Sequence, residues 1–159
     1  MTSVSAASVS VRKMVAADLE QVMAIAASLK DAPHWRRSAY VAALDPVSMP
    51  CRIALVAAKS SSNNVIGFAI ASLIPPQAEL ESIAIRLDEQ RMGIGSKLIE
   101  GLIEELRTAA IREFMLEVRA SNIAAVAFYQ EQGWRGSGMR PRYYADPEED
   151  AILMSYSIR

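Results

Sequence analysis

Apolar and polar residues follow two different periods along the chain, and together these periods predict an ordered series of strands and helices. Alternating, β-branched-rich runs predict strands at residues 9–15, 51–59, 64–74, 78–86, 113–120 and 151–159, with a short strand also starting at Trp134. Apolar residues spaced three or four apart predict helices at residues 16–29, 34–44, 93–110 and 122–132. The order β-α-α-β-β-β-α-β-α-β-β is typical of a mixed α/β or α+β domain around one sheet.

The helix predicted at residues 93–110 has the clearest pattern in the chain. Its apolar stripe consists of Ile94, Leu98, Leu102 and Leu106, widened by Ile99 and Ile103. The polar segment "SSSNN" between two apolar runs predicts a hairpin turn. A length of 159 residues with 52% hydrophobic content suits one core. We therefore expect a single domain over residues 1–159, with residues 1–8 as a flexible tail.

Charge and cysteine content narrow the class of protein. The net charge is −1, so no overall attraction to nucleic acid or to an anionic membrane is expected. The chain shows no signal-peptide pattern and no apolar run of membrane-spanning length. Cys51 is the single cysteine, which excludes an internal disulfide and a cysteine metal cluster. We expect a cytoplasmic protein without a metal, in which Cys51 is buried in its strand.

The stretch "QRMGIGSKLI" opens the long helix and has the composition of a phosphate loop. The dinucleotide pattern G-x-G-x-x-G fails because Leu98 stands at the third glycine position. The triphosphate pattern fails because Gln90 stands at its first glycine, and Ser96 and Lys97 are in reversed order. What remains is Q-x-x-G-x-G at a helix start, where free amides and the helix dipole favour an anion. A glycine-rich turn without a ligand is the alternative.

Several further motifs extend this pattern: "ELESIAI" before the glycines, then "LEVRASNIAAVAFYQEQGW" and "YYADPEEDAILM". Together they resemble the GNAT acetyltransferases over Glu79 to Ile158, and by motif they are nearest to the bacterial ribosomal-protein-alanine N-acetyltransferases. The resemblance implies a central twisted mixed sheet of about six to seven strands, flanked by about four helices. It also implies that acetyl-CoA binds this chain as a cosubstrate. The implied contacts are Ile83, Ala84 and Ile85 for the pantetheine arm, the amides of Arg91, Met92, Gly93, Ile94, Gly95 and Ser96 for the pyrophosphate, and Asn122.

Acetyl transfer to an amine requires a proton acceptor for the amine and a proton donor for the thiolate. Glu117, a carboxylate in an apolar strand, matches the general base of the resembling family, and an ion pair with Arg119 is the alternative. Glu81, on the preceding strand, is the second candidate for the base. Tyr129 lies two helical turns after Asn122 and matches the family's general acid, whereas a core aromatic is the alternative. We expect Glu79 and Glu81 to share a face with Ile83 and Ile85.

The residues that bind the acceptor are predicted from less specific patterns than those that bind the donor. In the resemblance, a loop containing Tyr143 and Tyr144 covers the acceptor peptide, and Trp35 helps to line the groove. His34 is expected to have a solvated or structural role. The expected acceptor is the N-terminal amine of a protein, because its ordinary pKa of about 7.7–8.0 leaves a neutral fraction near pH 7. A small-molecule amine acetyltransferase and a non-catalytic acyl-CoA sensor are the alternatives, and the protein is expected to be a monomer or homodimer.

Overall fold

The computed structural model describes residues 8–30 and 32–159, so most of the predicted tail lies outside the described residues. The strands are β1 (Val9–Lys13), β2 (Cys51–Lys59), β3 (Val65–Ile74), β4 (Gln77–Ile85), β5 (Glu113–Arg119), β6 (Arg135–Ala145) and β7 (Glu148–Ser157). The α-helices are α1 (Leu19–Ser28), α2 (Arg37–Leu44), α3 (Ile94–Thr108) and α4 (Ile123–Glu131), and the short 3-10 helices are η2 (Ala16–Asp18) and η3 (Leu87–Glu89). The order of strands and α-helices predicted from the sequence is confirmed.

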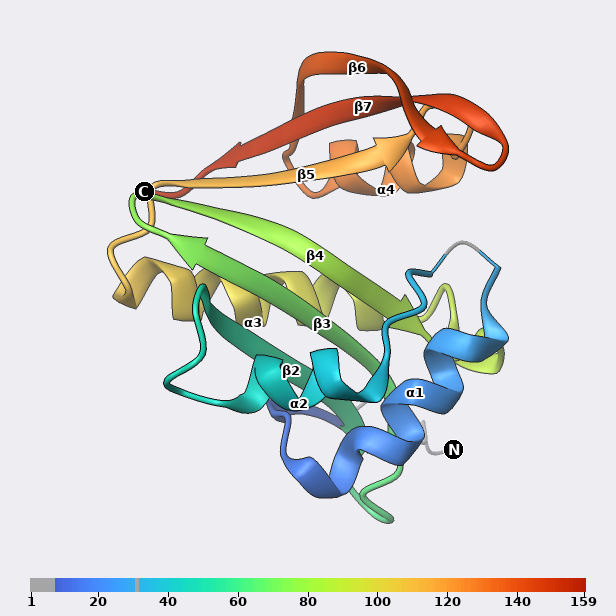
Figure 1. Ribbon diagram of the computed structural model, residues 1–159. Coiled ribbons are helices and arrows are strands. Elements are labelled where there is room, and N and C mark those ends of the chain that lie inside the picture. Colours follow the sequence, from blue (N-terminus) through green and yellow to red (C-terminus); the bar gives the residue numbers. More distant parts are fainter. Residues whose placement is uncertain (1–7, 31) are drawn as a thin grey trace, which may run out of the picture.

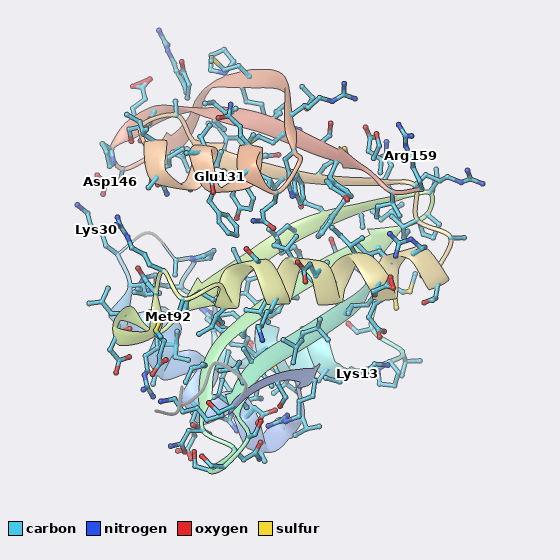
Figure 2. All side chains as sticks on the ribbon, turned by 180° about the vertical axis from the view of Figure 1, so that it is seen from behind. Lys13, Lys30, Met92, Glu131, Asp146 and Arg159 are labelled. Atoms are coloured by element: carbon cyan, nitrogen blue, oxygen red, sulfur yellow. The ribbon has the colours of Figure 1, made fainter. Side chains whose placement is uncertain are left out.

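All seven strands form one mixed sheet in the order β1-β2-β3-β4-β5-β7-β6. Neighbouring strands are antiparallel except β4 and β5, which are parallel. Helices α1 and α2 cover one face of the sheet, and α3 and α4 cover the other (Figures 1 and 2). This mixed α/β architecture is the one expected from the sequence.

Each face of the sheet has its own hydrophobic core. The α3-side cluster contains the whole predicted apolar stripe of α3, packed on alternate residues of β2 to β5, such as Phe114 and Leu116. The α1-side cluster joins α1 and α2 to the opposite face of the sheet through residues such as Val56, Phe68 and Ile70. Each side chain on a central strand therefore points either to the α3 side or to the α1 side of the sheet.

Strands β4 and β5 begin side by side and then separate (Figure 1). They pair only from Gln77 to Glu79 and from Glu113 to Met115, although both strands continue beyond these residues. We call the unpaired part, residues 80–85 of β4 and 116–119 of β5, the β4–β5 fork. Main-chain groups that face this fork have no strand partner, so they are free to bind a ligand.

A bulge in β4 corrects one prediction. Leu80 pairs with Ala71 while Ser82 pairs with Ile70, so Glu81 is an extra residue in β4. A bulge of this kind shifts the alternation of side chains by one residue. As a result Leu80 and Ile83 both pack in the α3-side cluster, and Glu79 lies on the α1 side. The expectation that Glu79 shares a face with Ile83 and Ile85 was therefore wrong.

Two other expectations also fail. Cys51 is exposed rather than buried, because it is the first residue of β2 at the end of the sheet. Tyr143 and Tyr144, expected in a loop, lie within β6. The register between β6 and β7 shifts between Arg140 and Tyr144, and Arg142 has a positive φ of 55°. The two tyrosines therefore sit where the strand is irregular.

Candidate active site

The start of α3 presents a row of free main-chain amides. Gly93 caps the helix with φ 81° and ψ 7°, and Arg91 also has a positive φ of 65°. The first helical amide with a carbonyl partner is that of Lys97, which donates to Gly93 at 3.2 Å. Among the described residues, the amides from Arg91 to Ser96 have no acceptor. This is the geometry of an anion site at a helix N-terminus.

The charges around these amides also favour an anion. Asp88 and Glu89, which precede the loop, are held by Arg86 at 2.7 and 3.3 Å. Arg91 and Lys97 are exposed, and neither has an ion-pair partner within the described part of the chain. The two free cations therefore raise the local positive potential beside the amides.

Helix α4 is fixed against this same helix start. A Cβ atom placed on Gly95 would lie 3.1 Å from the Phe128 ring, so the glycine permits the close approach of α4. The Gln132 side chain donates a hydrogen bond to the Ser96 hydroxyl at 2.9 Å. The Ser96 hydroxyl accepts this bond, so its O–H and the main-chain amide of Ser96 both remain free to donate to a ligand.

The edge of β4 that faces the fork carries main-chain groups without partners. Arg86 donates its amide to Ile66 of β3, and alternation along an antiparallel strand turns Ala84 the same way. Ile83 and Ile85 therefore point their main-chain groups toward the fork. The carbonyl of Ile85 accepts from the Gln90 side chain at 3.0 Å, which leaves the Ile85 amide and both groups of Ile83 open.

Asn122 and Tyr129 lie on α4 on the α3 side. The Asn122 side chain caps the helix by accepting from the amide of Ala125 at 3.1 Å. Tyr129 is buried between Phe128 and Trp134, at ring distances of 5.2 and 5.6 Å. Burial raises the pKa of its phenol well above the ordinary value, so the group stays protonated.

Glu117 projects from β5 on the α1 side, because Leu116 and Val118 fill the α3-side cluster. Its Oε1 lies 3.4 Å from Nε of Arg140, while its Oε2 is buried and has no hydrogen-bond partner among the described residues. The neighbouring Glu117 carboxylate is the main cause of the raised pKa of Tyr143. A carboxylate with one engaged oxygen and one free oxygen is suited to accept a proton.

The two carboxylates of β4 differ in their partners. Glu81 is held by Arg52 through both oxygens, at 2.6 and 3.3 Å. Glu79 has no ion pair or hydrogen bond within the described residues. The pKa of Glu79 is raised, first by partial loss of hydration and then by the charges of Glu117 and Glu81. Of the two, Glu79 is therefore the carboxylate open to a substrate.

The remaining predicted acceptor residues lie on the same side of the sheet. Tyr144 lies under the guanidinium of Arg119, 4.3 Å from its ring centre, and Arg119 also pairs with Glu149 at 3.2 Å. Trp35 packs on Tyr40 at a ring distance of 5.2 Å and joins the α1-side cluster. Trp35 is half-buried and His34 is exposed.

The structure thus divides the predicted residues between two sides of the fork. The free amides of the α3 start, Asn122 and Tyr129 lie on the α3 side, and Glu117 and both tyrosines of β6 lie on the α1 side. Sequence reasoning missed Arg140 and Arg52, the partners of Glu117 and Glu81. Both partners come from other strands of the sheet, so no local pattern could have identified them.

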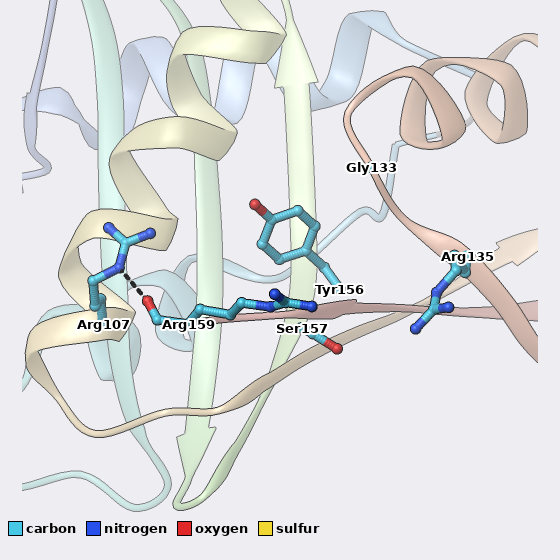
Figure 3. Close-up of a pocket in the computed structure, with 6 residues that line it drawn as sticks. All are labelled: Arg107, Gly133, Arg135, Tyr156, Ser157 and Arg159. Atoms are coloured by element: carbon cyan, nitrogen blue, oxygen red, sulfur yellow. Dashed lines mark hydrogen bonds between the residues drawn. The ribbon is translucent and has the colours of Figure 1, made fainter.

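A cavity of about 350 Å³ lies elsewhere in the structure. Its lining, which Figure 3 shows, comprises Arg107, Gly133, Arg135, Tyr156, Ser157 and Arg159. Arg107 is near the C-terminal end of α3, about 16 Å along the helix from Ser96 at 1.5 Å per residue. The cavity therefore does not contain the free amides.

Two searches of the described residues were negative. No group of three or more His, Cys, Asp or Glu side chains could hold a metal ion there. No helix in that same part of the chain is long and apolar enough to cross a membrane.

Comparison with known proteins identifies the class. The Acetyltransferase (GNAT) family matches residues 19–134. Ribosomal protein bS18-alanine N-acetyltransferase of Salmonella typhimurium is 41% identical over 101 residues, which cover 62% of this chain and 68% of that one. The crystal structure of the ribosomal-protein-S18-alanine N-acetyltransferase from Escherichia coli is 29% identical with a TM-score of 0.79, covering 94% of both chains. Arabidopsis thaliana NAA60, solved with acetyl-CoA, has the same fold at a TM-score of 0.84 and 16% identity, over 94% of this chain and 99% of that one.

The protein belongs to the GNAT acetyltransferase family and is an acetyltransferase enzyme. Its similarity to the ribosomal-protein-alanine N-acetyltransferases extends over sequence and fold. Enzymes of this family use acetyl-CoA.

Proposed function

We propose that this enzyme transfers the acetyl group of acetyl-CoA to the N-terminal amine of a protein, within a single domain. The observation that carries the proposal is that two sets of groups without hydrogen-bond partners lie on opposite sides of the β4–β5 fork. One is the row of free amides from Arg91 to Ser96, and the other is the buried, unpartnered Oε2 of Glu117.

The donor contacts follow from the free groups on the α3 side. The amides of the α3 start, with Arg91 and Lys97 beside them, hold the pyrophosphate of acetyl-CoA. The open main-chain groups of Ile83 and Ile85 pair with the amide groups of the pantetheine arm, as an added strand would. One of these amides polarises the thioester carbonyl and stabilises its developing negative charge.

The chemical roles follow from the two ionisable side chains. Glu117 takes a proton from the acceptor ammonium and releases it to water, which leaves the neutral amine that attacks the thioester carbon. The second proton that the nitrogen loses as the amide bond forms passes to water, from which Tyr129 is reprotonated. Tyr129 gives its phenolic proton to the sulfur as the bond between carbon and sulfur breaks, so CoA leaves as a thiol. Burial raises the pKa of this phenol, so its proton is in place when the sulfur leaves. Tyr143, Tyr144 and Trp35 line the acceptor path, and Glu117 rather than Glu81 is the base because Arg52 occupies both oxygens of Glu81.

Free thiol release from acetyl-CoA tests this function. The acceptors are peptides beginning with Ala, Ser, Met or Gly, beside free lysine and polyamines, and the same peptides with a blocked N-terminus are the control. We expect thiol release with at least one free N-terminus and none with its blocked form. Release with lysine or polyamines alone would assign a small-molecule acceptor, and acetyl-CoA binding without any release would assign a sensor.

A further inference from the structure

The α1 side of the fork, where the acceptor is proposed to bind, carries more carboxylate charge than the nearby guanidinium groups neutralise. Glu79, Glu81 and Glu117 interact electrostatically there, and the guanidinium groups paired with them are those of Arg52 and Arg140. Arg52 takes both oxygens of Glu81, and Arg140 reaches one oxygen of Glu117. Within the described residues, the carboxylate of Glu79 and Oε2 of Glu117 are therefore left without a cation.

These two open carboxylate groups lie on neighbouring strands. Glu79 pairs with Met115 at the last joined position before the fork, and Glu117 is two residues further along β5 on the same face. The charge of Glu117 contributes to the raised pKa of Glu79, so the two carboxylates are within electrostatic reach of each other. An ammonium nitrogen, with charge-assisted contacts of about 2.8 Å, can reach carboxylates from both positions.

The pKa values of the neighbouring side chains agree with a binding position for a cation between Glu79 and Glu117. Partial loss of hydration is the largest cause of the raised pKa of Glu79, the like charges of Glu117 and Glu81 add to it, and Arg140 opposes them as the smallest contribution. The pKa of Tyr143 on β6 is raised mainly by Glu117, and the charge of Glu79 adds the smallest contribution. A positive charge placed between Glu79 and Glu117 would relieve the repulsion between them.

We infer that Glu79 is an acceptor-binding residue, which together with Oε2 of Glu117 holds the acceptor amine as its ammonium form before Glu117 takes a proton. The inference rests on the proposed function and adds the basis of acceptor recognition. The amine is recognised by its charge, at the point where β4 and β5 begin to separate. An acidic residue next to the amine is then disfavoured, because Glu79 repels it.

Binding of a peptide to CoA-saturated enzyme tests the inference without turnover. The peptide is one that wild type acetylates, and the variants are Glu79→Gln and the control Glu113→Gln. Glu113 lies on the same strand as Glu117 but at the closed end of the sheet, where it accepts a hydrogen bond from Gln77. Both variants remove one negative charge from a neighbouring position.

We expect Glu79→Gln to weaken peptide binding about tenfold, the loss typical of one partly solvated charge-assisted contact. The KM for the peptide should rise similarly, kcat should stay within about twofold, and the KM for acetyl-CoA should not change. Glu113→Gln should bind as wild type does. A peptide with a hydroxyl in place of its N-terminal amine should bind wild type and Glu79→Gln equally weakly.

Equal binding of the amine peptide by wild type and Glu79→Gln would overturn the inference, as would an equal loss in Glu113→Gln. Because Glu79 is exposed, its substitution should not affect folding, and an unchanged melting temperature checks this point. If wild type acetylates no N-terminal peptide, the proposed function fails. If it does acetylate one and Glu79→Gln binds that peptide normally, only the role of Glu79 fails.

Discussion

The substitution Gly93→Ala tests whether the backbone at the start of α3 creates the donor site. Gly93 has φ 81° and ψ 7°, a left-handed conformation. A Cβ atom at this position would meet no heavy atom within 4 Å, so the cost of alanine is conformational rather than steric. That cost is about 1–2 kcal/mol for an L-residue in the left-handed region.

The variant can bear this strain in two ways. If it keeps the conformation, the free energy of unfolding falls by about 1–2 kcal/mol, and Tm falls by about 2–4 °C for each kcal/mol. If the backbone at residue 93 relaxes to another conformation, the amides of Ile94, Gly95 and Ser96 lose their alignment. Part of the binding free energy of acetyl-CoA is then spent on restoring that alignment. The apparent affinity for acetyl-CoA then falls by about 5- to 30-fold. The loss in unfolding free energy and the loss in binding free energy should therefore add up to about the strain of alanine at this position.

Calorimetric titration with acetyl-CoA and urea unfolding without ligand measure the two losses separately. Gly136→Ala is the matched control, because Gly136 also has no atom within 4 Å of a built Cβ and has no positive φ. Gly93→Asn should recover part of the loss, since asparagine tolerates this conformation better than alanine. If Gly93→Ala matches Gly136→Ala in both unfolding free energy and acetyl-CoA affinity, the reasoning about the helix start is refuted.

Two further predictions concern the general acid and the ion pair of Arg12 with Asp18. Tyr129→Phe should lower kcat about 100-fold with the unfolding free energy unchanged, since the hydroxyl has no hydrogen-bond partner among the described residues; full activity would refute the acid role. Asp18→Asn should lower the unfolding free energy by about 1–3 kcal/mol at pH 7, because it breaks the pair of buried Asp18 and partly exposed Arg12, with contacts of 2.8 and 2.9 Å. The Arg12 hydrogen bond lowers the pKa of Asp18, so this stabilisation is complete above the unfolded-state pKa of about 3.9 and is lost as pH falls through the lower folded-state pKa. Urea unfolding should therefore show the gap between wild type and variant closing in that acidic range, and a gap independent of pH would contradict the assignment.

The helices and strands were predictable because their periods are local properties of the sequence. The stripe of α3 is fully buried, since residues four apart share a face whatever the rest of the chain does. The open amides at its start were predictable for the same reason, because Gly93 and Gly95 stand at the beginning of the apolar stripe. These features depend on a short stretch of chain.

The bulge at Glu81 and the partners of the carboxylates were not predictable from local patterns. A strict period of two places Glu79 and Ile83 on one face, and only the register with β3 shows the inserted residue. Arg140 on β6 reaches Glu117 on β5 across the single strand β7 that lies between them. This strand order is a property of the whole sheet. Long-range pairing thus decides which carboxylate is free, and with it which one can act as a base.

The pH dependence of kcat/KM in Glu117→Gln, with acetyl-CoA and an N-terminal peptide acceptor, tests the central claim most directly. The substitution keeps the size of the side chain and removes its ability to accept a proton. If Glu117 is the base, kcat/KM falls about 100-fold near neutral pH and recovers at high pH, where the amine is already neutral. Acetyl-CoA affinity should remain as in wild type, because Glu117 lies on the opposite side of the fork from the free amides. A variant with wild-type kcat/KM across the whole pH range would contradict the account.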